Sequence, residues 1–149
     1  MPLNRRAFLL MLPAAAALPH LAHAMSPKIY TEDGIAVDGS DVVAYFTESK
    51  PVKGRNDITH DWMGATWRFA SEENRAKFQA DPTAYAPQYG GYCAYAASEG
   101  YVAPTDPAAW TIYEGKLYLN YSKSVRRRWL KDVPGRIAAA DANWPGILK

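Results

Sequence analysis

Trp62-Met63-Gly64-Ala65-Thr66-Trp67-Arg68-Phe69-Ala70-Ser71 is the stretch of sequence that decides the predicted fold. After Gly64-Ala65 aromatic residues alternate with polar ones, which is the pattern of a strand that returns from a tight turn. Ser71 then caps a helix whose first turn is acidic, and Asp81-Pro82 ends that helix. The sequence therefore predicts a β-hairpin over 58–70 that leads directly into a helix.

The rest of the chain is interrupted by turn residues, since it holds 11 prolines and 10 glycines, and this favours short elements. The other expected elements are, in chain order, turns at Asp33-Gly34 and Asp38-Gly39, a helical turn capped by Ser40 or Asp41, a hairpin over 110–121 that turns at Glu114-Gly115, a helix from Ser122 or Ser124 to Leu130, and a last helix that starts at Pro134. Gly90-Gly91 and the loop to Tyr101 are expected to be irregular. Two β-hairpins packed against short helices make a small single domain of the α+β class.

The first 24 residues have the order of a bacterial export signal. Arg5-Arg6 precedes an apolar run over 7–18, and the small-residue pattern Ala22-His23-Ala24 follows it. Arg-Arg followed by Phe-Leu resembles a twin-arginine signal, and the apolar run is too short to span a membrane comfortably. We therefore expect residues 1–24 to be a cleaved signal peptide and residues 25–149 to form one soluble periplasmic domain without a membrane anchor.

The charge of the mature chain argues against a nucleic-acid partner. Loss of the signal removes two of the 17 Lys and Arg residues and none of the 15 Asp and Glu residues, so the rest of the chain is formally neutral. Proteins that bind nucleic acids carry a clustered basic surplus. The one basic cluster, Arg126-Arg127-Arg128, falls in an expected helix and is interpreted as a solvated face.

Cys93 is the only cysteine of the chain, and it stands in Pro87-Gln88-Tyr89-Gly90-Gly91-Tyr92-Cys93-Ala94. Exported proteins usually pair their cysteines, and this thiol has no partner within the chain. It is therefore buried and inert, bound to a metal, chemically reactive or bonded to another molecule. The two glycines would let a ligand approach the backbone closely, whereas a free cysteine in a core is simply a small apolar residue.

Cys93 and His60 are the candidate metal ligands, because His60 is the only histidine left once the signal is removed. A thiolate is a soft donor for Cu(I) or Zn(II), and an imidazole suits both metals. Two-coordinate Cu(I) needs only such a pair, with Asp41, Asp61, Met63 or a tyrosine as supplements. A closed zinc site needs four ligands, so copper is favoured over zinc, within one molecule or at the interface of a homodimer. Alternatively, His60 is an exposed residue of its strand.

Two other classes of function remain open. Aromatic side chains with a polar tip dominate binding hot spots, so a groove near Tyr89-Gly90-Gly91-Tyr92 would suit a small molecule or a partner's loop, with Cys93 purely structural. A thiol-dependent enzyme or redox sensor is the other class. Nucleophilic catalysis by cysteine needs a base and an orienting group, and no local signature provides them, so we expect a protein that is not an enzyme.

Several segments, taken together and in order, resemble the exported bacterial YHS-domain proteins. These segments are Asp38 to Phe46, Trp62 to Ser71, Phe78 to Ala94, Asp106-Pro107 with Trp110, and Gly115 to Tyr121. The resemblance implies a small α+β domain related to the treble-clef-like metal-binding modules of copper-handling proteins. Those relatives typically offer more than one cysteine, but the helix after Ser71 has none. The four-thiolate or paired-thiolate site of those relatives therefore cannot be carried over, because Cys93 lies in the later Tyr-Gly-Gly-Tyr-Cys-Ala segment instead.

Overall fold

A computed structural model describes residues 25–149, and the expected signal peptide lies outside the described residues. The strands are β1 Thr31–Glu32, β2 Ile35–Ala36, β3 Arg55–Trp62, β4 Ala65–Phe69, β5 Asp106–Tyr113 and β6 Lys116–Asn120. The helices are α1 Val42–Thr47, α2 Glu72–Ala80, α3 Pro82–Tyr85, α4 Ala94–Glu99, α5 Lys123–Trp129 and α6 Val133–Asn143. Three short 3-10 turns lie at Val37–Gly39, Gln88–Gly91 and Leu130–Asp132.

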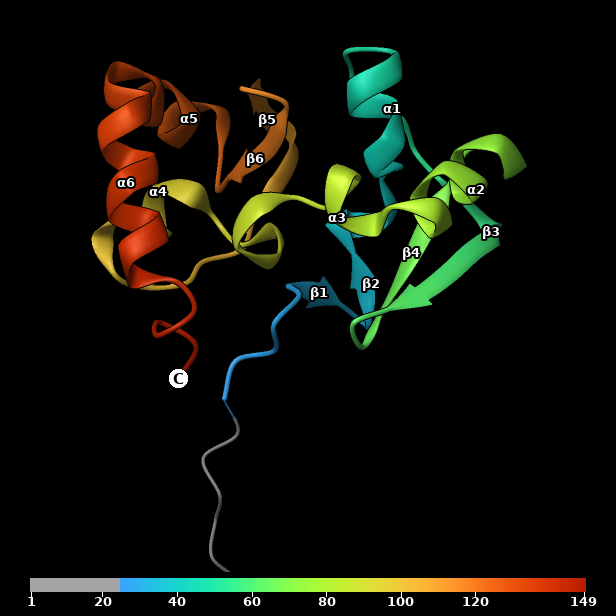
Figure 1. The fold of residues 1–149 in the computed structure, drawn as a ribbon, viewed down its shortest axis with the longest axis horizontal. Coiled ribbons are helices and arrows are strands. Elements are labelled where there is room, and N and C mark those ends of the chain that lie inside the picture. The colour runs from blue at the N-terminus through green and yellow to red at the C-terminus, as the bar shows by residue number, and fades with distance from the viewer. Residues whose placement is uncertain (1–24) are drawn as a thin grey trace, which may run out of the picture.

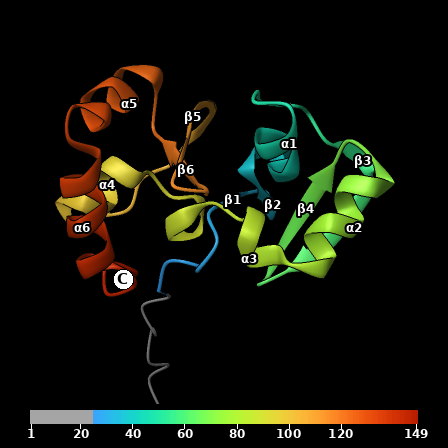
Figure 2. The same ribbon diagram turned by 45° about the horizontal axis from the view of Figure 1, so that its top comes forward.

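The chain forms two halves that lie side by side (Figure 1). The first half contains a four-stranded sheet of order β1-β2-β4-β3 together with α1, α2 and α3. The second half contains α4, α5 and α6, and the hairpin β5-β6 lies between these helices and the first half (Figure 2). This confirms the α+β class with two hairpins and short helices. Within residues 25–149 no helix has the length and apolarity needed to cross a membrane.

The first hairpin forms as predicted, but its turn lies one residue earlier than expected. Met63 and Gly64 both take positive φ, at 51° and 77°, and Ala65 already pairs with Trp62 as the first residue of β4. A two-residue turn with both φ values positive matches the right-handed twist of the strands. Trp67 and Phe69 then point into the core, with exposures of 1% and 0%.

Side-chain caps start the helices where the sequence predicts them. Asp41 caps α1, Ser71 caps α2 and Ser122 caps α5, each by accepting a backbone N–H of the first turn. These oxygens satisfy N–H groups that have no partner inside the helix. The start of α6 is shifted slightly, because Asp132 is its cap and Pro134 occupies its first turn.

Strand β6 joins the two halves because both of its faces are buried. Leu117 and Leu119 belong to the core of the first half, whereas Tyr118 belongs to the core of the second half with Trp129 of α5. Successive side chains of a strand point to opposite faces, so this one strand contributes to both cores. The second half is therefore packed through β6 onto the domain that the first hairpin builds.

The expectation of an irregular loop from Gly90 to Tyr101 is wrong, because Ala94–Glu99 forms α4. Cys93 is the N-cap of this helix, and Gly100 ends it with φ 93° in the left-handed region. Cysteine is a weak hydrogen-bond acceptor and is not among the preferred caps, so the usual start signal is absent. The expected tight turn is present just before it, since Tyr89, Gly90 and Gly91 have φ of 57°, 63° and 84°.

Buried tyrosines predict a loss of stability at high pH. Burial raises the pKa above 10.0 for Tyr30, Tyr45, Tyr89, Tyr92 and Tyr118. The Asp141 carboxylate, which accepts the Tyr89 hydroxyl at 2.9 Å, raises the pKa of Tyr89 further. As pH rises, these tyrosines ionise in the unfolded chain before they ionise in the folded protein. The stability that their neutral hydroxyls contribute is therefore fully present below about pH 10 and is lost as pH rises through their folded-state pKa values.

We expect urea unfolding to give a free energy that falls above about pH 10, in step with tyrosinate absorbance. Tyr89→Phe should reduce this alkaline loss, because it removes one of the hydroxyls with a raised pKa. A free energy of unfolding that stays constant to about pH 11.5 would contradict the expectation.

Candidate functional site

The Cys93 sulfur is held at the junction between α4 and the end of β6. Its side chain is 1% exposed. Sγ accepts hydrogen bonds from the backbone N–H of Ala96 at 3.5 Å and of Tyr121 at 3.3 Å, and it donates to Asn120 Oδ1 at 3.6 Å. Two N–H donors directed at one sulfur are favourable neighbours for a sulfur that carries negative charge, as a metal-bound thiolate does.

Cys93 also contributes to the wall of a pocket of about 290 Å³ (the thiol pocket). The pocket is lined by Cys93, Tyr95, Ala96, Tyr101, Ala103, Tyr121, Val125 and Arg128. Tyr101 and Tyr121 are 54% and 57% exposed, so their rings stand at the surface above the sulfur. Around the thiol the lining is therefore aromatic and apolar, with one cationic side chain, Arg128.

Asn120 is the buried polar residue beside the thiol. It is fully buried, and its Oδ1 accepts the backbone N–H of Tyr95 at 3.0 Å as well as the Cys93 thiol. Its Nδ2 has no hydrogen-bond partner among the described residues. A buried donor without an acceptor is costly, and Asn120 itself does not line the thiol pocket.

His60 lies in the other half of the molecule and does not approach Cys93. It is on β3, opposite Trp67 of β4. Its Nδ1 lies 3.3 Å from Gln79 Nε2, and its ring packs edge-on against Phe78 of α2. β3 and α4 lie at opposite ends of the structure in both views (Figures 1 and 2). A site made by His60 and Cys93 of the same molecule is therefore not formed.

Of the residues considered as supplementary ligands, Asp41, Asp61 and Met63 belong to the first half, whereas tyrosines do line the thiol pocket. Asp41 binds backbone and side-chain donors of its own half, and Asp61 accepts the Thr66 hydroxyl at 2.9 Å. In residues 25–149 no three His, Cys, Asp or Glu side chains cluster in a way that could hold a metal ion. The residues present do not fit a closed four-ligand zinc site. They provide one soft donor, the Cys93 thiolate.

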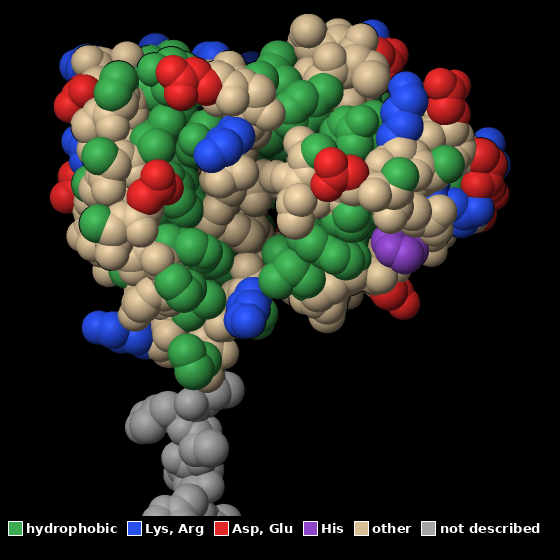
Figure 3. All heavy atoms as spheres, viewed as in Figure 1, with side chains coloured by type: hydrophobic (Ala, Val, Ile, Leu, Met, Phe, Trp, Pro, Cys, Tyr) green, Lys and Arg blue, Asp and Glu red, His purple; other side chains and the backbone are tan. Residues whose placement is uncertain are grey.

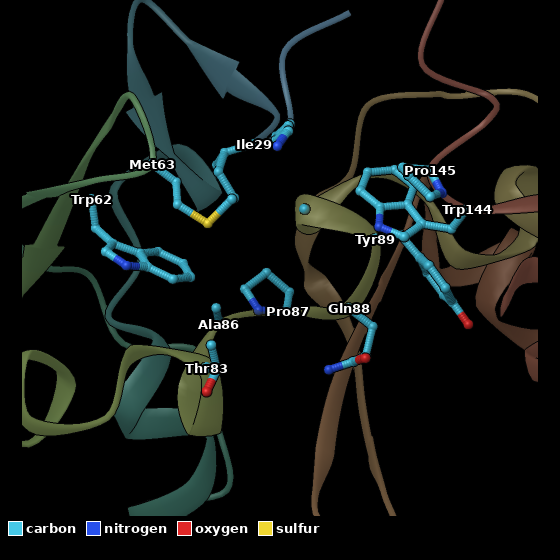
Figure 4. Close-up of a pocket in the computed structure, with 12 residues that line it drawn as sticks. Ile29, Trp62, Met63, Thr83, Ala86, Pro87, Gln88, Tyr89, Trp144 and Pro145 are labelled. Carbon is cyan, nitrogen blue, oxygen red and sulfur yellow. The ribbon is translucent and has the colours of Figure 1, made fainter.

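A second pocket, of about 420 Å³, lies between the two halves (the central cleft). Trp62 and Met63 of the first hairpin form one wall, Tyr89 and Trp144 form the other, and Pro87 lies between them (Figure 4). Apolar side chains gather on both sides of this hollow on the face of the molecule (Figure 3). The aromatic groove expected near Tyr89-Gly90-Gly91-Tyr92 is thus present, with walls from three distant segments.

The sequence did not identify four of the residues around the thiol: Tyr101, Asn120, Tyr121 and Arg128. Of the four tyrosines that lie near Cys93 in the sequence (Tyr85, Tyr89, Tyr92 and Tyr95), only Tyr95 lines the thiol pocket. The basic cluster was interpreted as a solvated face; Arg127 and Arg128 are indeed exposed, and Arg128 also lines the pocket. No local signal marks these residues, because they meet Cys93 only through the packing of α4 and α5 and the end of β6.

Fold and site together define a small α+β protein with one buried thiol at the start of a helix. A YHS domain is found at residues 43–89. The match covers α1 to α3 with the first hairpin, includes His60 and ends just before Cys93. Neither the curated proteins nor the solved structures gave a match.

Proposed function

We propose that this is a periplasmic, non-enzymatic YHS-domain protein that binds Cu(I) as cargo through the Cys93 thiolate. The observation that carries the proposal is the position of the sulfur, which lies in a pocket wall and accepts two backbone N–H groups. The YHS domain at residues 43–89 supports it, since metal binding is attributed to this family. The arginine pair and apolar run of residues 1–24 support export.

Copper suits this site better than zinc does. Soft thiolate ligands select Cu(I), whereas a structural zinc ion takes four protein ligands. Because the pocket supplies one soft donor, a second donor must come from outside the molecule. That donor is another copy of Cys93 or the thiol of a partner to which the metal is handed over.

The surroundings of Cys93 favour such a shared ion. A Cu(I) ion bound by two thiolates carries one net negative charge, so a nearby cation stabilises it. Arg128 is that cation in the thiol pocket. The N–H groups of Ala96 and Tyr121 also direct the positive ends of their dipoles at the sulfur, which favours negative charge there. A bare metal ion without an anionic second ligand would find the same cation unfavourable.

An anaerobic Cu(I) competition titration of the purified protein tests this proposal. With an excess of a small thiol as the second donor, we expect one Cu(I) per chain. Cys93→Ser should weaken binding by about 100-fold or more, because it replaces the soft ligand by a hydroxyl. His60→Ala is the matched control and should bind as the wild type does, since its ring contacts only α2 and the hairpin in the structure.

Two results would refute the proposal. One is wild-type affinity in Cys93→Ser, and the other is loss of binding in His60→Ala with Cys93 intact. Both variants need urea unfolding curves close to that of the wild type, so that a folding defect is not read as a lost ligand.

The central cleft supports a second candidate, a binding module in which Cys93 is structural. Its volume of about 420 Å³ falls in the range of small-molecule sites, and such sites are mainly apolar and aromatic. Met63, which is 48% exposed, is one of the residues that line the central cleft. Failure of the Cu(I) titration would leave this cleft as the functional site.

A further inference from the structure

A third pocket, of about 510 Å³, adjoins the thiol pocket (the basic pocket). It is lined by Tyr95, Arg128, Lys131, Asp132, Gly135, Arg136 and Ala139, which come from α4, from α5 and the turn that follows it, and from the start of α6. Tyr95 and Arg128 line both pockets. The two pockets are therefore adjacent, and Cys93 lines only the thiol pocket.

The basic pocket has cationic side chains that the protein itself does not neutralise. Arg136 is committed to the protein, because it lies over the Tyr95 ring at 4.1 Å, donates to Ser98 Oγ at 3.0 Å and pairs with Glu99. Among the described residues Arg128 and Lys131 take part in no ion pair. Two cationic side chains without an ion-pair partner, both beside one pocket, attract an anion.

The one carboxylate that lines the basic pocket is engaged with the backbone. Asp132 Oδ1 accepts the Gly135 N–H at 3.1 Å and caps α6. The three neighbouring arginines also differ from one another. Arg126 donates to Thr111 Oγ1 at 2.8 Å, whereas Arg127 and Arg128 are both exposed. Of the three, only Arg128 lines the two pockets.

We propose that the basic pocket binds the carboxylate of a small anionic thiol compound whose sulfur enters the thiol pocket. This inference rests on the proposed function in one respect, namely that Cys93 is the group the ligand reaches. Arg128 and Lys131 hold the carboxylate, and Tyr95 lies between the two ends of the ligand.

The combined site explains where the second donor of a Cu(I) ion comes from. A thiol compound held by its carboxylate would present its sulfur next to the Cys93 thiolate, so the ion would be bound by one protein ligand and one exchangeable ligand. A neutral or cationic thiol would lack the contact with Arg128 and Lys131. Selectivity for anionic thiols is therefore the property that distinguishes this inference from copper binding by Cys93 alone.

The first test needs no copper and uses thiol–disulfide exchange at Cys93. The anionic reagent is dithiobis(nitrobenzoate), and the uncharged reagent is dithiodipyridine. In each case the Cys93 thiolate attacks one sulfur of the aromatic disulfide, a protein–aryl disulfide forms, and one aryl thiol leaves and is measured by its absorbance. Cys93 is oxidised and one half of the reagent is reduced, so the electrons balance.

We expect the native protein to prefer the anionic reagent, and raised salt to weaken this preference. The double variant Arg128→Gln, Lys131→Gln should lower the anionic rate about 10-fold relative to the neutral rate. Arg127→Gln removes a neighbouring exposed charge from the same helix and is the matched control, which should leave the ratio unchanged. An equal loss in Arg127→Gln, an unchanged ratio in the double variant, or no reaction of native Cys93 with either reagent would overturn the inference.

A second test adds copper and separates this inference from the proposed function. Cu(I) is titrated in the presence of mercaptopropionate, which is anionic, or cysteamine, which is cationic. We expect tighter binding with mercaptopropionate, and the double variant should abolish that difference. Binding with equal affinity for both thiols would leave the copper function standing and overturn the inference. Charge-selective exchange at Cys93 without copper binding would support the basic pocket and refute the copper function.

Discussion

Gly90→Ala is expected to prevent folding or to lower the free energy of unfolding by more than about 4 kcal/mol. A Cβ at this position would lie 1.8 Å from the carbonyl oxygen of Lys28 and 2.9 Å from its carbonyl carbon. Both atoms are backbone, so they cannot rotate away as a side chain would. The Gly90 carbonyl also accepts the Tyr30 N–H at 2.9 Å, and this contact holds the first described strand region against the turn before Cys93.

Gly115→Ala is the matched control for Gly90→Ala. Both glycines have positive φ, at 63° and 76°, but nothing lies within 4 Å of a Cβ at Gly115. Alanine in the left-handed region costs about 1–2 kcal/mol by itself, so the control separates backbone strain from the clash. Urea unfolding of both variants measures the difference. Similar free energies of unfolding for the two variants would show that the contact with Lys28 does not matter.

Asp41→Ala is expected to lower the free energy of unfolding by about 3–5 kcal/mol. Asp41 is fully buried, and its carboxylate accepts four hydrogen bonds. Oδ1 takes the N–H groups of Val43 and Ala44 at the start of α1. Oδ2 takes the N–H of Ala70 and the amide of Asn74, where β4 passes into α2. Removal of the carboxylate leaves these buried donors without an acceptor.

Two further variants test whether the Asp41 contacts cause the loss. Asp41→Asn keeps the shape but turns one accepting oxygen into a donor, so about 2 kcal/mol should be lost. Asp57→Ala removes an exposed carboxylate that pairs with Arg55 at 2.9 Å, and it should leave the free energy of unfolding nearly unchanged. Equal effects of Asp41→Ala and Asp57→Ala on urea unfolding would contradict the role assigned to the buried carboxylate.

The YHS match and the thiol pocket lie in different parts of the chain but are structurally coupled. Residues 43–89 form the core of the first half, and Leu117 and Leu119 of β6 complete that core. The next residues of the chain, Asn120 and Tyr121, contact the Cys93 sulfur. The strand that completes the core of the first half therefore also positions two neighbours of the thiol.

Both hairpins, the α+β class, the cap at Ser71 and the positions of two further caps to within one or two residues were predicted from the sequence alone. These features depend on residues a few positions apart, such as a side-chain oxygen and an N–H three residues on, so the signal is local. Helix α4 was missed because its cap is Cys93, which is not among the preferred caps for a helix start.

Only the tertiary structure decided what surrounds the thiol. His60 was the obvious soft partner by residue type, but β3 places it in the other half of the molecule. Asn120, Tyr121 and Arg128 come within reach of Cys93 because β6 and α5 pack against α4. Such contacts join residues about 30 positions apart and depend on how buried faces fit, which no local pattern encodes. The sequence thus identified Cys93 as the residue on which the choice between the functional hypotheses depends. The packing decided that its neighbours are N–H donors, tyrosines and an arginine.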